Sequence, residues 1–410
     1  MQSANADLTL VEADKDTGSA NPSGFHENTN LQSLVSPVSV EEFRAQYWEQ
    51  KPLIIHRGRP DYYGDLFTLQ DFDGSVRRAS NGYVKTAEAS SKKSALHRGA
   101  TPSALENVLT DMRDGHTLIL DAVHRYDDKL GQMCRMLGRE SGFLHQTNIY
   151  LTPPNGKGFT AHWDNHDVFI MQVLGCKHWK VEKSRRTLPQ KGTNIEEEGR
   201  ELRGELYDFT LEQGDTVYIP RGFVHAAECG SESSMHITLG IFPTSWDDLL
   251  YAAIKATILR DDDLRLALPI GYHQGDGTEI VSRIENVLRN AADPAFLAQT
   301  LDQFRDEFVQ KAPLDIEGQI ASFFQPKPLA LDDRVGPRAG LFYTIRPHAE
   351  TVTLNVGTRS VTFPDFFGEA LKFALEKPSF AIRELPGDLE DEERIVFIER
   401  LMQEALVVRT

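Results

Sequence analysis

Hydrophobic residues in the middle of the chain fall in short runs that predict β-strands. An apolar run interrupted only by Gln172 covers 168–173, and a second short run of β-type residues covers 217–219. Between them Lys177, Trp179 and Val181 occupy alternate positions. Alternate residues of a strand point to the same face. Lys177 is therefore expected to point into the same interior as Trp179.

Beyond residue 246 the apolar spacing becomes helical, and from 341 it alternates again. Apolar residues recur three and four positions apart over 249–258, 280–288 and 297–308, which predicts three helices. The remaining predicted elements are strands at 342–345, 352–354, 361–363 and 406–408, and helices near 365–375 and 391–402.

The N-terminal part alternates between helical, extended and polar patterns. Ser39 and Glu42 form a capping-box start for a helix whose apolar stripe includes Phe43. Residues 1–30, which are rich in Asn, Ser, Asp and Gly, are expected to form a disordered tail. Further predicted elements are a strand at 53–55, a solvated basic loop at 75–100, a helix at 102–114, a strand at 117–120, a helix at 129–137 and an acidic loop at 196–198.

Length and composition predict a cytoplasmic protein of two or three domains. The chain has 410 residues, which is more than one typical core organises. No apolar stretch reaches the roughly 18 residues of a membrane span, and the N-terminus lacks the pattern of a signal peptide. Three cysteines without paired spacing suit reduced thiols. The net charge of −17 disfavours direct binding of nucleic acid and is compatible with a basic partner.

Three residues between 162 and 225 form a candidate metal site. His162 and Asp164 stand two positions apart, so in an extended segment both point to one face. His225 would complete a set of two imidazoles and one carboxylate. This set suits non-haem Fe(II), because it leaves coordination positions open for a co-substrate and O2. Zinc accepts the same donors, but structural zinc sites usually close a tetrahedron, often with thiolates.

The sequence around His225 and Lys177 bears on this site. Pro220 and Gly222 predict a turn that aims His225 onto the start of the next strand. If the metal binds a 2-oxo acid, Lys177 is suited to neutralise its distal carboxylate. The alternative interpretation, a surface lysine on a hairpin, fits the spacing equally well.

In their order and content these segments resemble the JmjC ribosomal oxygenases, also described as the cupin-4 group of 2-oxoglutarate-dependent hydroxylases. The resemblance covers about residues 31–260, with a weaker match to the C-terminus. The segments that carry it are 147–154, 162–164, 168–172, 175–179, 214–225, 236–238 and 246–250, with upstream matches at 34–37, 42–43, 47–53 and 62–67.

The resemblance implies roles for individual residues. It makes His162, Asp164 and His225 the ligands of Fe(II), and places Lys177 on the distal carboxylate of 2-oxoglutarate. Residues implied to line the co-substrate pocket are Asn148, Tyr150 and Thr238. Residues expected at the substrate mouth are Trp163, Asn165 and His166. Trp163 and Cys176 depart from the residues usual in the family, which leaves the substrate less defined than the chemistry.

The fold expected from the resemblance is mainly β with α. A double-stranded β-helix (cupin/JmjC) barrel over 31–245 is expected to precede a helical dimerisation domain over 246–325 and a small winged-helix domain over 326–410. The helical domain implies a homodimer. The acidic helix-forming stretch 385–404 favours a structural or protein-contact role for the winged helix over nucleic-acid binding.

The expected activity is hydroxylation of a histidine or arginine side chain in a ribosomal protein, with Fe(II), 2-oxoglutarate and O2. Four alternatives stay open on sequence alone. They are the same chemistry on another peptide such as a natural-product precursor, demethylation of an N-methylated lysine, a binding module without turnover, and a zinc hydrolase on the same barrel.

Overall fold

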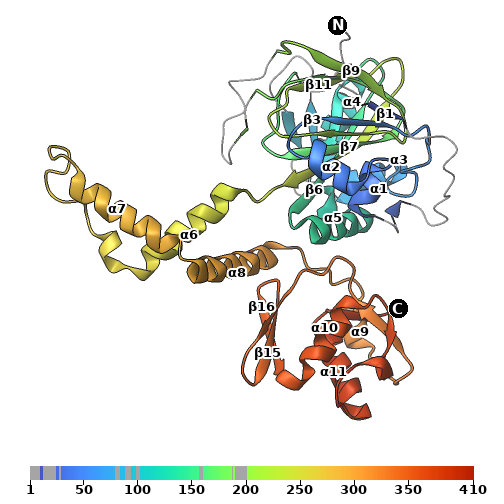
Figure 1. Ribbon diagram of the computed structural model, residues 1–410. Coiled ribbons are helices and arrows are strands. Elements are labelled where there is room, and N and C mark those ends of the chain that lie inside the picture. Colours follow the sequence, from blue (N-terminus) through green and yellow to red (C-terminus); the bar gives the residue numbers. More distant parts are fainter. Residues whose placement is uncertain are drawn as a thin grey trace, which may run out of the picture. The chain divides into compact units, whose positions relative to one another are not determined.

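The computed structural model describes residues 10–12, 25–26, 29–78, 84–87, 94–97, 102–156, 160–186, 188–189 and 201–410. The chain divides into two compact units, 1–243 and 244–410. Figure 1 shows the first in blue to green and the second in yellow to red. The expected ranges 31–245, 246–325 and 326–410 stay predictions.

The first unit is built on two β-sheets that enclose an apolar interior. The larger sheet has the strand order β1-β2-β10-β7-β12-β6-β5-β3-β4, and the smaller one β11-β8-β9. The strands of the larger sheet are β1 (Leu10–Glu12), β2 (Leu53–His56), β3 (Val84–Ala87), β4 (Ser94–His97), β5 (Thr117–Leu120), β6 (Leu144–Thr152), β7 (Asp167–Leu174), β10 (Thr216–Ile219) and β12 (Ser234–Phe242). Those of the smaller sheet are β8 (Lys177–Glu182), β9 (Leu206–Leu211) and β11 (His225–Glu228).

Strand β7 is buried on both faces, which explains why most of its residues are apolar without alternation. Val168 and Ile170 pack with Trp179 of β8 in the core between the two sheets. Phe169 and Met171 point to the other face and join a second core under a layer of helices. A strand buried on both faces is apolar at most positions, and the buried Gln172 is hydrogen-bonded to Oγ of Ser234 (2.8 Å). The predicted buried strand is confirmed.

Helices cover the outer face of the larger sheet (Figure 1). The capped start predicted at Ser39 is confirmed, since its side chain accepts a hydrogen bond from the amide of Glu42 (3.1 Å). The helices of this unit are α1 (Leu31–Val35), α2 (Val40–Gln46), α3 (Leu69–Arg78), α4 (Pro102–Arg113), α5 (Asp128–Ser141) and the 3-10 turn η2 (Val123–Arg125).

Two expectations for the N-terminal part are wrong where the structure describes it. The segment 75–100 was expected to be a solvated loop, but α3 extends to Arg78 and β3 and β4 form a hairpin against β5. Its polar composition did not indicate that β5 offers a free strand edge for pairing. Within the expected tail, β1 pairs in parallel with β2, and Phe25 is buried in the core. The rest of 1–24, and the acidic stretch 196–198, lie outside the described residues.

The second unit begins with the three predicted helices, which are confirmed as α6 (Trp246–Arg260), α7 (Thr278–Ala291) and α8 (Pro294–Lys311). Shorter helical elements are η3 (Asp262–Arg265), α9 (Gln319–Phe324), η4 (Asp365–Phe367) and η5 (Ile382–Glu384). Over the described residues no helix is both long and apolar enough to cross a membrane.

The C-terminal part of this unit is a small β/α region. Its two sheets have the orders β17-β13-β18 and β14-β15-β16, and they pack with α10 and α11 around a core that includes Leu354, Leu371 and Phe397. The predicted strands and helices are found here, while α9, β13 and β17 had not been predicted. Their bounds are β13 (Arg334–Pro337), β14 (Thr344–Pro347), β15 (Thr351–Val356), β16 (Arg359–Pro364), α10 (Gly368–Glu376), β17 (Phe380–Ala381), α11 (Asp391–Gln403) and β18 (Val407–Arg409).

Candidate active site

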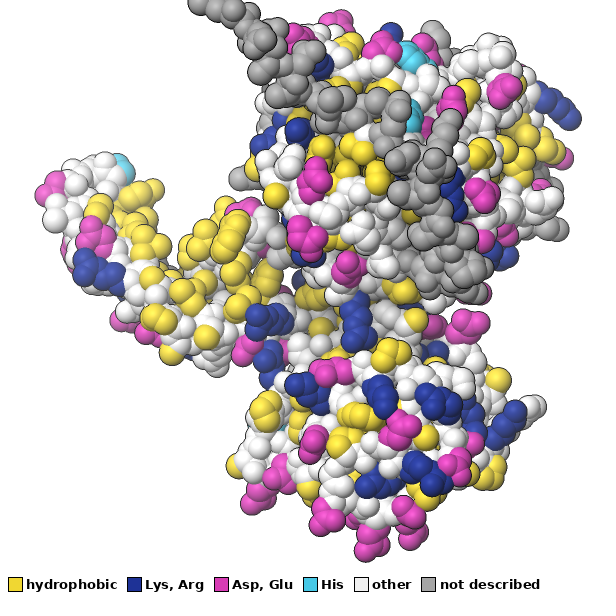
Figure 2. Space-filling model, turned by 45° about the vertical axis from the view of Figure 1, so that its right-hand side comes forward, with side chains coloured by type: hydrophobic (Ala, Val, Ile, Leu, Met, Phe, Trp, Pro, Cys, Tyr) yellow, Lys and Arg dark blue, Asp and Glu magenta, His cyan; other side chains and the backbone are white. Residues whose placement is uncertain are grey.

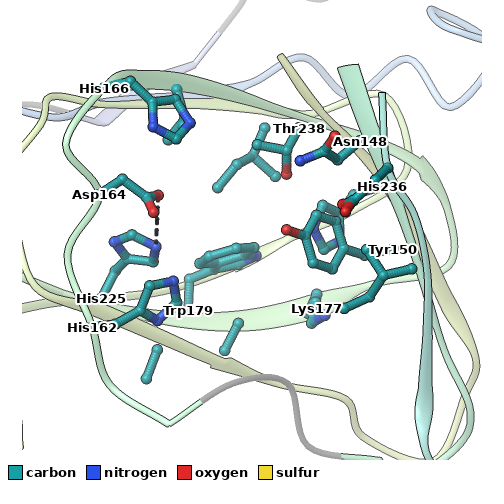
Figure 3. Close-up of a pocket in the computed structure, with 16 residues that line it drawn as sticks. Asn148, Tyr150, His162, Asp164, His166, Lys177, Trp179, His225, His236 and Thr238 are labelled. Atoms are coloured by element: carbon teal, nitrogen blue, oxygen red, sulfur yellow. Dashed lines mark ion pairs between the residues drawn. The ribbon is translucent and has the colours of Figure 1, made fainter. Parts of the chain in front are cut away.

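The three candidate metal ligands converge between the two sheets. One ligand atom each from His162, Asp164 and His225 lies within 4.8 Å of the other two. The rings of the two histidines are 4.5 Å apart at their centroids, and Nε2 of His225 is 3.7 Å from Oδ2 of Asp164. This separation leaves room for one ion between the three side chains, which Figure 3 shows pointing toward one another.

Hydrogen bonds orient both imidazoles. Nδ1 of His162 lies 2.9 Å from the carbonyl oxygen of Thr160, and Nδ1 of His225 lies 3.1 Å from that of Phe223. A carbonyl oxygen can only accept, so each Nδ1 carries the proton and each Nε2 keeps its lone pair for a metal. Backbone partners of this kind are the usual support of metal-binding histidines.

The electrostatics put His225 and Asp164 in the protonation states that a metal needs. Burial, reinforced by His162, lowers the pKa of His225 to about 4, so its imidazole is neutral near pH 7. Burial raises the pKa of Asp164, but the neighbouring His162 and His225 outweigh this, and its pKa lies below the ordinary value. Neutral imidazoles and an ionised carboxylate are the forms that bind divalent metals.

The turn after β10 positions two of the candidate ligands, Asp164 and His225. Gly222 has a positive φ of 82°, a conformation that glycine adopts readily. Its amide donates to the carbonyl of Asp164 (3.0 Å), which ties the turn to the segment that carries the carboxylate. The turn predicted from Pro220 and Gly222 thus directs His225 onto the start of β11, which begins at that residue.

The cluster opens into a cavity of about 260 Å³ inside the barrel (Figure 3). Residues opposite one another on the central strands line it, because Thr238 of β12 pairs with Asn148 of β6 on one side and with Ile170 of β7 on the other. The lining residues are Ile119, Asp121, Asn148, Tyr150, His162, Asp164, His166, Val168, Ile170, Lys177, Trp179, His225, Ala226, Ala227, His236 and Thr238. The three residues expected in the co-substrate pocket, Asn148, Tyr150 and Thr238, therefore share one cavity with the candidate ligands.

Lys177 lies in the same cavity and is only 2% exposed, which rules out the interpretation as a surface lysine. Its Nζ donates to Oγ1 of Thr152 (3.0 Å). Burial lowers the pKa of Lys177 to about 8, so the side chain still carries its charge near neutral pH. None of the described carboxylates forms an ion pair with it.

The three residues expected at the substrate mouth lie in different environments. His166 lines the cavity, and its ring stacks on Phe242 with the centroids 4.8 Å apart. Trp163 is 1% exposed and is not among the residues that line the cavity, and its expected place at the substrate mouth stays a prediction. Asn165 is partly exposed and hydrogen-bonds through Oδ1 to Nδ1 of His166 (3.2 Å), but it does not line the cavity either.

Two polar residues of the lining were not assigned from sequence. His236 stacks on the ring of Tyr150, with the centroids 4.9 Å apart, and burial beside Lys177 lowers its pKa well below the ordinary value. Its position two residues before Thr238 on one strand was a usable signal. Asp121 precedes η2 outside any strand, so no periodicity pointed to it.

Comparisons with known proteins agree with this geometry. A family model described as the JmjC domain matches residues 121–249, the segment that contains all three candidate ligands. Ribosomal oxygenase 1 of Gallus gallus is 31% identical over 300 residues, which are 67% of this chain and 50% of the relative. Ribosomal oxygenase 2 of Mus musculus is 30% identical over 323 residues, which are 74% and 68% of the two chains. The chain spans about half the length of several curated relatives, the chicken protein among them.

A solved structure shows the same fold. The crystal structure of YcfD from Escherichia coli superimposes with a TM-score of 0.57 at 17% identity, over 91% of this chain and 98% of that one. A further structure of the E. coli protein, a ribosomal oxygenase, is a complex with cobalt and 2-oxoglutarate.

The barrel and its His-Asp-His cluster define a protein of the JmjC class. Within that class the chain belongs to the ribosomal oxygenases, a family of 2-oxoglutarate-dependent enzymes.

Proposed function

We propose that the protein is an Fe(II)- and 2-oxoglutarate-dependent oxygenase that hydroxylates a histidine or arginine side chain of a ribosomal protein. The observation that carries the proposal is that a three-ligand cluster and a buried lysine share one cavity. When bound, the iron and 2-oxoglutarate supply the oxidising chemistry with O2. His162, Asp164 and His225 would hold the iron.

Lys177 supports 2-oxoglutarate as the co-substrate. A buried ammonium is costly unless an anion pairs with it, and Thr152 is a neutral partner. A dicarboxylate that reaches from the cluster to Lys177 supplies the missing charge. The role of Lys177 is to bind and orient its distal carboxylate through a charge-assisted hydrogen bond.

The other lining residues hold the reaction space and exclude water. Ile170 and Trp179 contribute apolar walls from the two facing sheets. Asn148 is itself held in place, because its Oδ1 accepts from the amide of Ala122 (2.9 Å) and leaves the amide nitrogen to donate. Such fixed groups position a bound molecule without reorganisation at the moment of reaction.

Two observations favour a cationic side chain in a basic protein as the target. Asp121 lines the cavity in addition to the candidate ligand Asp164. The net charge of −17 attracts basic proteins over a longer range. A ribosomal protein fits both, and the names of the relatives agree.

The test is the intact mass of every ribosomal protein from cells that contain the native chain or its Asp164→Ala variant. The proposal predicts one protein that carries an additional 16 Da, about the mass of one oxygen atom, only with the native chain. Asp121→Asn should weaken hydroxylation of an arginine-containing peptide more than it weakens 2-oxoglutarate turnover without peptide. Identical masses, together with turnover on an unrelated peptide or loss of methyl groups from lysine, would assign the activity to one of the alternatives.

We also propose that the helices at the start of the second unit form a homodimer. Large apolar side chains are exposed there, and Figure 2 shows them gathered over α6 and α7. They are Trp246, Leu250, Tyr251, Leu259, Leu266, Leu268, Ile270, Tyr272, Val281, Ile284 and Leu288. An apolar surface of this extent usually marks an interface. Light scattering should give twice the chain mass, and Leu250→Asp with Ile284→Asp should give the monomer.

For the C-terminal β/α region we propose a winged-helix-like module in protein contacts. The first turn of α11 carries Asp391, Glu392 and Glu393, which repel a phosphate backbone. A cytoplasmic location stays a prediction.

A further inference from the structure

A second cavity, of about 220 Å³, lies on the reverse side of the sheet that carries the candidate active site. Its floor is formed by His145 of β6, Phe169 of β7 and Ile241 of β12, and His145 and Ile241 are opposite one another in register. These residues alternate with those of the barrel interior, so they point into the helical layer. The walls are Leu31, Leu34, Phe43, Arg44, Trp48, Leu137, Ser141 and Phe143.

The walls are aromatic and mutually packed. The ring of Trp48 stacks on that of Phe143 at 5.8 Å with an interplanar angle of 6°, and Phe43 meets Trp48 edge-on at 6.1 Å. An apolar cavity of about 150 Å³ accepts benzene. The present one therefore has room for a planar ring system somewhat larger than benzene.

His145 places a hydrogen-bond acceptor in this apolar space. Its Nδ1 lies 3.0 Å from the carbonyl oxygen of Phe143 and must donate to it, so Nε2 carries a lone pair. No described group hydrogen-bonds to Nε2. Burial lowers the pKa of His145 to about 4, which keeps the ring neutral and Nε2 an acceptor.

Arg44 adds a positive charge to the lining. It belongs to the last turn of α2, and it is exposed. Within the described part of the chain it forms no ion pair. A guanidinium beside an apolar cavity is suited to a carboxylate whose apolar part is buried.

We propose that this cavity binds a small aromatic acid. The ring system packs against Phe43, Trp48 and Phe143, a ring N–H or hydroxyl donates to Nε2 of His145, and the carboxylate pairs with Arg44. Neither the metal cluster nor Lys177 takes part, so the site is separate from the proposed oxygenase chemistry.

Isothermal titration calorimetry of the full chain with indole-3-acetate tests the site, in the presence of excess 2-oxoglutarate. One molecule should bind per chain. Indole, which lacks the carboxylate, and naphthalene-1-acetate, which lacks the ring N–H, should each bind about tenfold more weakly. In Arg44→Gln, indole-3-acetate should bind no more tightly than indole. In His145→Phe, it should bind no more tightly than naphthalene-1-acetate.

Two further variants control for the place of binding. Ser141→Trp fills the cavity from its edge and should abolish binding, with the melting temperature as a check of folding. Arg139→Gln removes an exposed arginine of the same helix α5 and should leave binding unchanged. The proposal is overturned if no heat is detected at millimolar probe, if 2-oxoglutarate displaces the probe, or if folded Ser141→Trp binds as the native chain does.

Discussion

His162 and His225 are hydrogen-bonded to each other through their backbones. The amide of His162 donates to the carbonyl of His225 (3.1 Å), and the amide of His225 donates to the carbonyl of His162 (2.8 Å). This isolated antiparallel bridge joins two segments that are far apart in sequence. The two backbone segments that carry the imidazoles are therefore held side by side by main-chain hydrogen bonds.

Because the bridge uses the backbone, replacing a ligand side chain should remove activity without unfolding the barrel. Asp164→Ala, His162→Ala and His225→Ala should each lower 2-oxoglutarate turnover by more than about 100-fold, since even changes behind the ligands often cost 10- to 100-fold. Succinate release with added Fe(II) measures this. Asp208→Ala, which removes an exposed carboxylate of β9, is the control. Full activity in any ligand variant would remove that residue from the metal site.

Lys177→Ala should weaken 2-oxoglutarate binding by roughly 10- to 100-fold, the range expected for a hydrogen bond to a charged group. Lys177→Arg should lose less, because it keeps the charge but changes the geometry. Calorimetry on the chain loaded with a redox-inactive metal gives the dissociation constants. The matched control is Lys180→Ala, on the opposite face of the same strand β8. Unchanged affinity in Lys177→Ala would place the co-substrate elsewhere.

The affinity for 2-oxoglutarate should fall as the pH rises above about 8. The pKa of Lys177, lowered by burial to about 8, means that the free protein holds the ammonium below this pH and loses it above. At pH 9 roughly one tenth of the lysine remains charged, so the dissociation constant should rise by up to about tenfold. Lys177→Arg stays charged throughout and should show no such rise. An equal rise in both proteins would exclude Lys177 as the titrating group.

Gly240→Ala should disturb the substrate side of the cavity. A Cβ at this position would lie 2.8 Å from Cδ2 of His166, so the ring must leave its stack on Phe242. We expect peptide hydroxylation to fall while 2-oxoglutarate turnover without peptide continues. Gly230→Ala is the control, because its Cβ would meet nothing within 4 Å. A parallel loss of both activities would mean that His166 supports the metal site instead.

Trp163→Ala should act on stability. Since the side chain is 1% exposed, its removal leaves a cavity that costs about 3–5 kcal/mol, whereas Trp163→Phe should cost much less. Urea unfolding of the two variants measures the difference. A direct role in substrate binding would instead lower peptide affinity in Trp163→Phe at unchanged stability.

The sequence by itself determined the chemistry of the candidate site. Two residues at i and i+2 in an extended segment share a face, so His162 and Asp164 were expected to converge. The same rule placed Lys177 with Trp179, and the helical spacing of 246–311 predicted α6, α7 and α8. These predictions depend only on backbone geometry over a few residues, and residue spacing in the sequence indicates that geometry directly.

Only the tertiary structure decided which residues pack against each face of the predicted strands and helices. Alternation could not distinguish a buried from a surface Lys177, because burial depends on the opposing sheet. It could not reveal that Trp163 is buried, nor that a polar segment pairs with β5, since both depend on distant partners. Asp121 and the cavity beside His145 likewise arise where separate elements pack together. Contacts between residues remote in sequence are the part of the fold that local pattern does not encode.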